Sequence, residues 1–495
     1  MHSFSLADLA RQVGGQLIGA ATISVLDIAC SSADVRHGTL FVAVRGTSAD
    51  GHNFIQEAAR LGASAAVVED VAALGSLPGI VVKSSRLALS SIAAIMNGRP
   101  AQKLKTIGIT GTNGKTTTNW IVYHILNAIG GGCQRIGTLG TECMGKSAEV
   151  GSLTSPDAIS MQKLLRKAVE MGAHSCVLET SSHALDQARV EDLDFDVAVF
   201  TNLTRDHLDY HKTFENYFAA KRHLFELLTR SAKPTKGAVV HGDDEHGRAL
   251  IEELPSLGLV DWSFGTADSV TLKICDVKET AEEMTVELRE RGQQSMTHLS
   301  APFIGRHNAE NLVAAYGVCR ALGYEPAAIA EALERIPQVP GRLERVGETK
   351  PRVFVDYAHT PDALRRVLQA VRPTTRGDLW VVFGCGGDRD RGKRPEMAAV
   401  ASELAEQVVI TSDNPRTEDP SAIINDIMAG AVGPRIVQVD RRSAIEEAIA
   451  LAHSDDTVVI AGKGHEDYQI VGQEKLFFSD QQVAEAVLAR MDCAG

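Results

Sequence analysis

Short apolar runs alternate with amphipathic helical patterns along almost the whole chain. This alternation is typical of α/β proteins whose sheets are mostly parallel. We expect strands at residues 40–44, 65–68, 80–82, 107–109, 175–178, 197–200, 238–240, 353–355, 379–383, 408–410 and 458–460. We expect helices at 54–61, 87–96, 120–126, 309–322 and in a stretch that ends near 336.

Two proline- and glycine-rich stops divide this pattern into three segments. The first stop is Asn97-Gly98-Arg99-Pro100, and the second contains Pro337 and Pro340-Gly341. Such combinations end helices and begin turns. A chain of 495 residues, at roughly 150 residues per domain, also suggests about three domains. The predicted domains are therefore residues 1–99, 100–338 and 339–495.

A glycine-rich loop lies between the expected strand at 107–109 and the helix around 120–126. Its sequence is Thr110-Gly111-Thr112-Asn113-Gly114-Lys115-Thr116-Thr117. Backbone N–H groups in such a loop, together with the helix N-terminus, bind phosphates. The lysine would neutralise phosphate charge and the Thr116 hydroxyl would hold Mg²⁺. The usual spacing asks for glycine where Ile109 stands, so this loop is a variant P-loop.

Composition and charge narrow the function classes. A net charge of −13 argues against nucleic acid as a partner, because duplex binding needs basic surfaces. The eight cysteines form no C-x-x-C pair and no zinc spacing. The first residues lack the features of an export signal, and no apolar run approaches the length of a membrane span. We therefore expect a cytoplasmic protein.

Polar residues follow nearly every expected strand, where ligands bind in open parallel sheets. They form one group per predicted sheet, at 179–183 and 201–209 in the middle segment and at 356–361, 384–391, 411–416 and 461–466 in the last. Glu179 and His207 are candidate metal ligands beside Thr116. Histidine is an unusual ligand for Mg²⁺, so His207 could equally be a hydrogen-bonding loop residue.

Lys221 interrupts an apolar helical face. Phe214, Phe218, Phe225 and Leu228 share that face by their spacing. The lysine can extend its ammonium to water, as most such lysines do. Alternatively it is desolvated, its pKa falls, and the neutral amine can add CO₂ to form a metal-binding carbamate.

Taken together, these residues closely resemble the Mur ligases of bacterial cell-wall synthesis. The resemblance runs from end to end of the chain. It rests on the P-loop variant, Glu179, His207, the box Gly305-Arg306-His307-Asn308-Ala309-Glu310-Asn311, the pair Gly341-Arg342, and Asp356-Tyr357-Ala358-His359. It implies a smaller N-terminal α/β uridine-nucleotide domain, a central P-loop ATPase-type domain with a parallel sheet, and a C-terminal Rossmann-like ligase domain.

The resemblance also implies a reaction and its catalytic residues. ATP phosphorylates a carboxylate, an amine attacks the acyl phosphate, and phosphate leaves. Residues 111–117, Asn308, Arg342 and Asp356 would bind ATP, the last two from across a domain interface. Thr116, Glu179, His207 and a carbamylated Lys221 would hold Mg²⁺. The implied catalytic set is Lys115, Glu179, His207, Lys221, Asn308, Arg342, Asp356 and His359.

Two further groups are implied to hold the other substrates, UDP-MurNAc-L-Ala-D-Glu and meso-diaminopimelate. The nucleotide contacts are Cys30, Ser32, Thr47, Ser48 and Ala49, and the muramoyl-peptide contacts are Thr154, Ser155, Ser181, Gln187 and Arg189. Ala33 stands where the family usually has arginine. The amino-acid contacts are Arg389, Asp413, Asn414, Pro415, Arg416, Gly462 and Glu466.

The loop Asp413-Asn414-Pro415-Arg416 matches the version found in members that add meso-diaminopimelate. This substrate is lysine with one extra carboxylate, which a guanidinium can bind through two hydrogen bonds. The alternatives left open are a lysine-adding relative, a ligase of the folylpolyglutamate synthetase type, a P-loop kinase and a non-catalytic nucleotide-binding module. We expect a monomer without a nucleic-acid partner.

Overall fold

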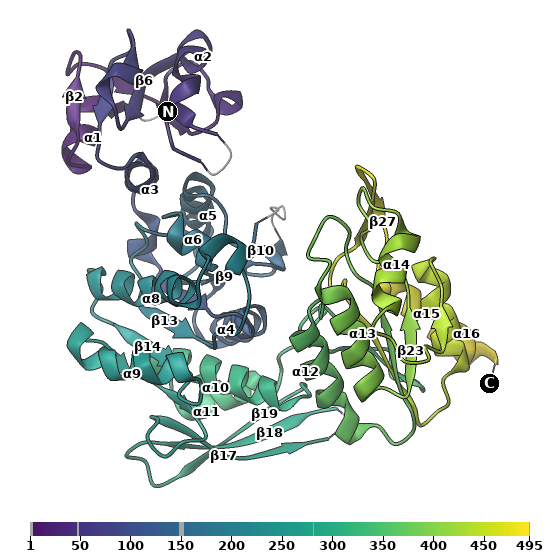
Figure 1. The fold of residues 1–495 in the computed structure, drawn as a ribbon. Coiled ribbons are helices and arrows are strands. Elements are labelled where there is room, and N and C mark those ends of the chain that lie inside the picture. Colours follow the sequence, from purple (N-terminus) through teal and green to yellow (C-terminus); the bar gives the residue numbers. More distant parts are fainter. Residues whose placement is uncertain (1–2, 47–48, 148–152, 281, 495) are drawn as a thin grey trace. The chain divides into compact units, whose positions relative to one another are not determined.

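The computed structural model describes residues 3–46, 49–147, 153–280 and 282–494 (Figure 1). The chain forms two compact units. The first contains residues 1–274, 288–297 and 310–332, and the second contains residues 275–287, 298–309 and 333–495. The domain boundaries expected at 99/100 and 338/339 stay predictions.

The N-terminal sheet has the strand order β2-β7-β6-β5-β4, with β2 antiparallel to its neighbour. Leu40 and Val42 of β5 pack in one core cluster, whereas Phe41 packs in another on the opposite face. Burial on both faces explains the continuous apolar run in the sequence. The elements are β1 (Phe4–Ser5), α1 (Leu6–Gln12), β2 (Gln16–Ile18), β3 (Ser24–Val25), β4 (Asp27–Ala29), β5 (Thr39–Val42), α2 (Ile55–Arg60), β6 (Ala63–Val68), β7 (Gly79–Val81) and α3 (Ser85–Met96).

The central sheet has the order β11-β10-β9-β12-β8-β13-β14-β15 and is parallel from β9 to β15. Its strands are β8 (Lys105–Thr110), β9 (Cys133–Gly137), β10 (Gly140–Cys143), β11 (Lys146–Ser147), β12 (Ser175–Glu179), β13 (Val197–Phe200), β14 (Gly237–Val240) and β15 (Val260–Asp261). Its helices are α4 (Lys115–Ile129), α5 (Ala158–Glu170), α6 (Ser182–Asp186), α7 (Leu208–His211), α8 (Phe214–Arg230) and α9 (Glu245–Leu257). Strand β8 lies between β12 and β13, so the three strand ends meet at one edge.

A sheet that the strand pattern did not predict follows, in the order β16-β17-β18-β19. Its strands are β16 (Phe264–Gly265), β17 (Leu272–Glu279), β18 (Met284–Glu290) and β19 (Met296–Ala301). Met284, Val286 and Leu288 are buried and alternate with more accessible residues, so the period-2 pattern of a strand was present. The expected helices follow as α10 (Arg306–Ala321) and α11 (Pro326–Leu333).

The C-terminal sheet has the order β20-β21-β25-β22-β23-β24, and β20 runs antiparallel to β21. Helices α12, α13 and α14 cover one face, and α15 and α16 cover the other. The strands are β20 (Glu344–Val346), β21 (Arg352–Asp356), β22 (Leu379–Phe383), β23 (Gln407–Ile410), β24 (Ile436–Val437) and β25 (Thr457–Ala461), and a hairpin follows as β26 (Tyr468–Val471) and β27 (Glu474–Phe477). The helices are α12 (Pro361–Val371), α13 (Lys393–Leu404), α14 (Pro420–Met428), α15 (Arg441–Leu451) and α16 (Asp480–Ala494). The α/β class and every strand and helix expected above are confirmed.

The core beneath the P-loop strand predicts a stability effect. A Cβ added at Gly108 of β8 would lie 2.7 Å from Phe195 Cε1 and 2.9 Å from Leu224 Cδ1. We expect Gly108→Ala to lower the free energy of unfolding by about 1–3 kcal/mol, because the crowded core must shift. Leu224→Ala removes one of the two obstructing side chains. Denaturant unfolding of both single variants and the double variant should therefore show a double-variant cost below the sum of the single costs; simple additivity would contradict this packing argument.

Candidate active site

The P-loop forms the turn between β8 and α4, as expected. Gly111 has a φ of 146° and Gly114 a φ of 86°, backbone conformations that glycine adopts without strain. A side chain at Gly111 would also collide with the Thr201 hydroxyl. The Lys115 ammonium donates to the carbonyls of Gly111 at 2.9 Å and Thr112 at 2.8 Å. The loop therefore presents N–H groups and a lysine at a helix N-terminus, an arrangement that binds phosphates.

Glu179 lies at the end of β12, directly beside this loop. Its carboxylate accepts hydrogen bonds from Thr116 Oγ1 at 3.1 Å, Thr138 N at 2.8 Å and Thr138 Oγ1 at 3.1 Å. The residue is 1% exposed. A buried carboxylate and a hydroxyl are hard oxygen donors that fit Mg²⁺, which fills its remaining positions with water.

Lys221 is buried within α8, so it does not extend to water as most lysines on an apolar face do. It is 1% exposed, and its ammonium donates to the Gly111 carbonyl at 2.7 Å. The Tyr217 ring centre lies 4.5 Å away. Burial, and secondarily the charge of Lys115, hold the pKa of Lys221 well below its ordinary value.

His207 lies on the loop after β13, at the N-terminus of α7. Its ring centre is 4.9 Å from that of His183 and 6.2 Å from that of Tyr217. Its Nε2 is 3.5 Å from Asp206 Oδ2. Burial lowers its pKa. Within the described ranges, no cluster of three or more histidine, cysteine, aspartate or glutamate side chains has the arrangement of a metal site.

A cavity of about 510 Å³ in the first unit gathers much of the expected nucleotide and muramoyl-peptide group. Among the expected contacts, Cys30, Ser32, Ala49, Gln187 and Arg189 line it. Thr47 and Ser48 lie outside the described residues. Burial raises the pKa of the Cys30 thiol.

Ser155 connects this cavity to the end of β12. Its carbonyl accepts from Arg189 Nη1 at 2.9 Å, and its hydroxyl donates to the Glu179 carbonyl at 2.7 Å. The Ser181 amide donates to the same hydroxyl at 3.1 Å, and Thr154 Oγ1 lies 3.2 Å from Thr138 Oγ1. A continuous series of hydrogen-bonded residues thus runs from the cavity to the carboxylate beside the P-loop.

In the second unit, Asp356 is the last residue of β21, and its carboxylate is tightly held. It accepts from the amides of Leu343 at 2.7 Å and Ala358 at 2.8 Å, and burial raises its pKa. The Arg342 guanidinium stacks 4.6 Å from the Tyr357 ring centre. His359 Nδ1 lies 2.8 Å from the Tyr357 carbonyl.

Asn308 is anchored in the same unit. It is buried, and its amide donates to the Ile304 carbonyl at 2.8 Å.

The loops after β23 and β25 also come together. Asn414 Nδ2 donates to Glu466 Oε2 at 3.1 Å, and burial with the nearby Asp413 raises the pKa of Glu466. Arg416 donates to the Gly387 carbonyl at 2.7 Å from a backbone with a φ of 52°. A Cβ built on Gly386 would lie 2.8 Å from Arg416 Nη1 and 3.8 Å from Arg389 Cγ. Thus most of the expected amino-acid contacts form one polar group that contains both cationic and anionic side chains. Gly462 is the first residue of the loop after β25.

Several residues of these sites were missed by the sequence reasoning. Thr138 holds Glu179 but lies in a turn with no polar pattern of its own. Arg86 lines the 510 Å³ cavity, although it comes from helix α3. Lys463 lies on the loop after β25, within the polar group expected at 461–466, but was assigned no role. Its ammonium is 3.2 Å from Asp413 on the loop after β23, a contact that the sequence does not reveal.

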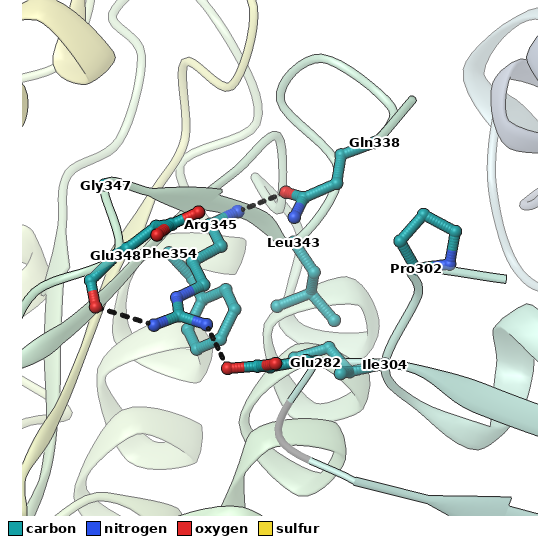
Figure 2. Close-up of a pocket in the computed structure, with 9 residues that line it drawn as sticks. All are labelled: Glu282, Pro302, Ile304, Gln338, Leu343, Arg345, Gly347, Glu348 and Phe354. Atoms are coloured by element: carbon teal, nitrogen blue, oxygen red, sulfur yellow. Dashed lines mark hydrogen bonds and ion pairs between the residues drawn. The ribbon is translucent and has the colours of Figure 1, made fainter. Parts of the chain in front are cut away.

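A second cavity, of about 490 Å³, contains none of the expected site residues (Figure 2). The Arg345 guanidinium lies at its centre, donating to Glu282 at 3.2 Å and to the Glu348 carbonyl at 3.1 Å. Gln338 accepts from the Arg345 amide at 2.8 Å. This cavity is separate from the loops after β23 and β25.

No helix in the described part of the chain is long and apolar enough to cross a bilayer. The seven cysteines whose side chains are described are all free.

Comparisons with known proteins agree along the chain. The Mur ligase family catalytic domain matches residues 25–99, the Mur ligase middle domain 109–319, and the Mur ligase glutamate ligase domain 341–464. A UDP-N-acetylmuramoyl-L-alanyl-D-glutamate–2,6-diaminopimelate ligase of Thermosynechococcus vestitus is 44% identical, with 94% of this chain and 93% of the relative covered. The ligase of the same name from Pseudomonas putida is 43% identical, with 94% and 95% covered.

Solved structures give the same result. A structure of a ligase of that name has a TM-score of 0.73 at 31% identity and covers 99% of this chain and 100% of its own. A folylpolyglutamate synthase of Mycobacterium tuberculosis has a TM-score of 0.64 at 20% identity, with 81% of this chain and 94% of its own covered, which shows a shared fold alone. By its sequence, its three-domain organisation and its fold, this chain belongs to the Mur ligase family.

Proposed function

We propose that the protein is an ATP-dependent ligase that adds meso-diaminopimelate to UDP-MurNAc-L-Ala-D-Glu, forming the tripeptide precursor of peptidoglycan. The observation that carries this proposal is the 43–44% identity, over nearly the whole chain, to UDP-N-acetylmuramoyl-L-alanyl-D-glutamate–2,6-diaminopimelate ligases. Arg416 in the Asp-Asn-Pro-Arg loop agrees with the choice of amino acid. The cofactors are ATP and Mg²⁺.

A carboxylate does not condense with an amine unaided, because it is a poor electrophile. Transfer of the γ-phosphoryl group of ATP to the carboxylate gives an acyl phosphate and ADP. The amine then attacks the acyl carbon, and phosphate leaves from the tetrahedral intermediate. Catalysis of such steps is mostly positioning and charge neutralisation.

The residues of the first unit suit these tasks. The P-loop amides, the α4 N-terminus and Lys115 would bind the phosphates. Thr116 and Glu179 would hold Mg²⁺, which when bound neutralises phosphate charge. We assign His207 to the same metal region. In the second unit, we assign Asn308, Arg342 and Asp356 to ATP binding and catalysis, and His359 to catalysis.

The 510 Å³ cavity is the proposed site of the UDP-MurNAc-dipeptide. Its lining contains the guanidiniums of Arg86 and Arg189, which suit a diphosphate and peptide carboxylates. We also infer that the protein acts in the bacterial cytoplasm, where ATP and nucleotide-linked precursors are found. The monomeric state stays a prediction.

Lys221 is proposed to act as a carbamate. Its buried amine loses a proton readily, and the neutral nitrogen can add CO₂ to give an N-carboxylate and a released proton. The change converts a cation beside the P-loop into an oxyanion that can support Mg²⁺. The burial of Lys221 supports this proposal over a solvated lysine.

Lys221→Ala should lower kcat by about 100-fold or more, because an oriented charge near the phosphates is lost. Formate or acetate should restore part of the activity by occupying the vacated position. Steady-state kinetics with and without these anions measures both effects. Lys212→Ala, at an exposed lysine nearby in the sequence, is the control. Full activity of Lys221→Ala without added anion would assign Lys221 a packing role.

Arg416→Ala should reduce the preference for meso-diaminopimelate over L-lysine by up to about 10⁴-fold, because the extra carboxylate loses its charged partner. Acyl phosphate formation should persist, and hydroxylamine trapping without amino acid measures it. The matched control is Arg435→Ala, at an exposed arginine. An unchanged preference in Arg416→Ala would remove Arg416 from substrate selection.

One reaction separates the proposed function from its alternatives. Purified protein is incubated with ATP, Mg²⁺, UDP-MurNAc-L-Ala-D-Glu and meso-diaminopimelate or L-lysine. We expect ADP, phosphate and amide in equal amounts, with meso-diaminopimelate preferred. A stable phosphorylated product without amine would indicate a kinase, no turnover a binding module, and preferential L-lysine addition a lysine-adding ligase. Glutamate addition to a folate would indicate a folylpolyglutamate synthetase.

A further inference from the structure

Lys463 is a fully buried cation between the two loops of the proposed amino-acid site. Its side chain is 0% exposed, and the residue directly follows Gly462. Its ammonium lies 3.2 Å from Asp413 Oδ1 and donates to Asn414 Oδ1 at 2.9 Å and to the Tyr468 carbonyl at 2.7 Å. The three contacts come from the loop after β23 and from hairpin β26–β27, so one ammonium joins both to the loop after β25.

Hairpin β26–β27 is fixed to the loop after β23 by further hydrogen bonds. Gln469 Nε2 donates to the Asp413 carbonyl at 2.6 Å, and the Ile470 amide to Asn414 Oδ1 at 3.0 Å. The Arg416 amide donates to the Ile470 carbonyl at 3.0 Å. Asn414 Oδ1 therefore accepts from both Lys463 and Ile470, and Ile470 in turn holds the Arg416 amide through its carbonyl.

A second buried cation holds the roots of the same loops. Arg441 is 1% exposed, pairs with Asp480 at 2.7 Å, and donates to the carbonyls of Ser412 at 3.3 Å and Ala461 at 3.0 Å. These carbonyls directly precede the loops. Arg441 thus holds the roots of the loops, whereas Lys463 contacts Asp413 and Asn414 of the loop after β23 and Tyr468 of the hairpin.

The carboxylates around Lys463 belong to the proposed amino-acid site. Asp413 and Glu466 are nearby carboxylates, with Glu466 Oε2 4.0 Å from the ammonium. Burial lowers the pKa of Lys463, and Asp413 opposes this effect. Breaking a buried ion pair leaves an uncompensated charge, whereas an apolar replacement of the whole pair is often neutral. A role in stability alone therefore does not account for a lysine here.

We propose that Lys463 is a positioning residue that sets the selectivity for diaminopimelate. Its ammonium fixes Asp413 and Asn414 so that Arg416 and Glu466 face the distal carboxylate and ammonium of the amino acid. This inference rests on the proposed function. Lys463 contacts Asp413, Asn414 and Tyr468, and the proposal assigns it no contact with ATP or the UDP-linked substrate.

The test is Lys463→Met in the full-length protein. We expect the KM for meso-diaminopimelate to rise about tenfold or more, because hydrogen bonds to a charged group are lost. The selectivity over L-lysine should fall by a similar factor. The KM values for ATP and UDP-MurNAc-L-Ala-D-Glu, and hydroxylamine-trapped acyl phosphate, should stay within about twofold. A merely structural role would not move selectivity while leaving the other substrates unchanged.

Lys475→Met is the matched control. Lys475 lies on the same hairpin and 3.7 Å from the Tyr468 ring centre, but its side chain is exposed. It should behave as the wild type. If Lys463→Met does not fold by circular dichroism, Lys463→Arg decides, because a planar guanidinium cannot reproduce three ammonium contacts.

The outcomes distinguish a failure of the proposed function from a failure of the proposed role of Lys463. A wild-type protein that forms no amide overturns the proposed function itself. An active wild type together with a folded Lys463→Met or Lys463→Arg variant of unchanged KM and selectivity overturns the role of Lys463 alone. A rise in all three KM values also overturns it, because the effect is then not confined to the amino acid.

Discussion

Parallel strand ends impose the constraint on which both candidate sites depend. In the central sheet, β8 pairs with β12 and β13, so Glu179 lies opposite Ile109 and Phe200 opposite Thr110. In the C-terminal sheet, β25 pairs with β21 and β22. Residues that are far apart in sequence must therefore meet at one edge of each sheet. The hydrogen bond from Thr116 to Glu179 joins the segment after β8 to the end of the adjacent strand β12. The ion pair of Lys463 with Asp413 joins the loops after β25 and β23, which β22 separates in the sheet.

Buried cations hold several loops of this protein, although its net charge is negative. Several cations are buried or nearly so, among them Lys221, Arg394, Arg441 and Lys463. Each lies at or beneath a loop that follows a strand, rather than on a basic surface. Arg394, for example, is held by Glu418 at 2.8 Å and donates to the Gly386 carbonyl at 3.3 Å. These cations hold loop backbones, and carboxylates neutralise three of them: Glu418 and Asp426 pair with Arg394, Asp480 with Arg441, and Asp413 with Lys463.

The sequence predicted most strands of the parallel sheets because burial on both faces leaves uninterrupted apolar runs. It did not predict β9, a buried strand whose run is interrupted by Gln134 and Arg135. It also did not predict the sheet from β16 to β19, although β18 carries an alternating pattern, or hairpin β26–β27, which is largely exposed. The proximity of Thr116 and Glu179 was expected because each follows a predicted strand. The sequence left two interpretations of Lys221, solvated or buried. Helical spacing shows which residues share a helix face, but it does not show which other elements pack on that face. Thr138 and Lys463 act through contacts distant in sequence, which no local pattern reveals.

The left-handed backbone at Arg416 has a cost for the fold itself. A φ of 52° at a residue with a Cβ is a conformation that glycine or asparagine adopts more easily, by about 1 kcal/mol. Replacement by either residue would relax the turn while removing its guanidinium. Under the proposed role of Arg416, a substitution that raises thermostability at this position would lower the selectivity for the substrate. Screens that select only for heat resistance would be expected to discard the arginine.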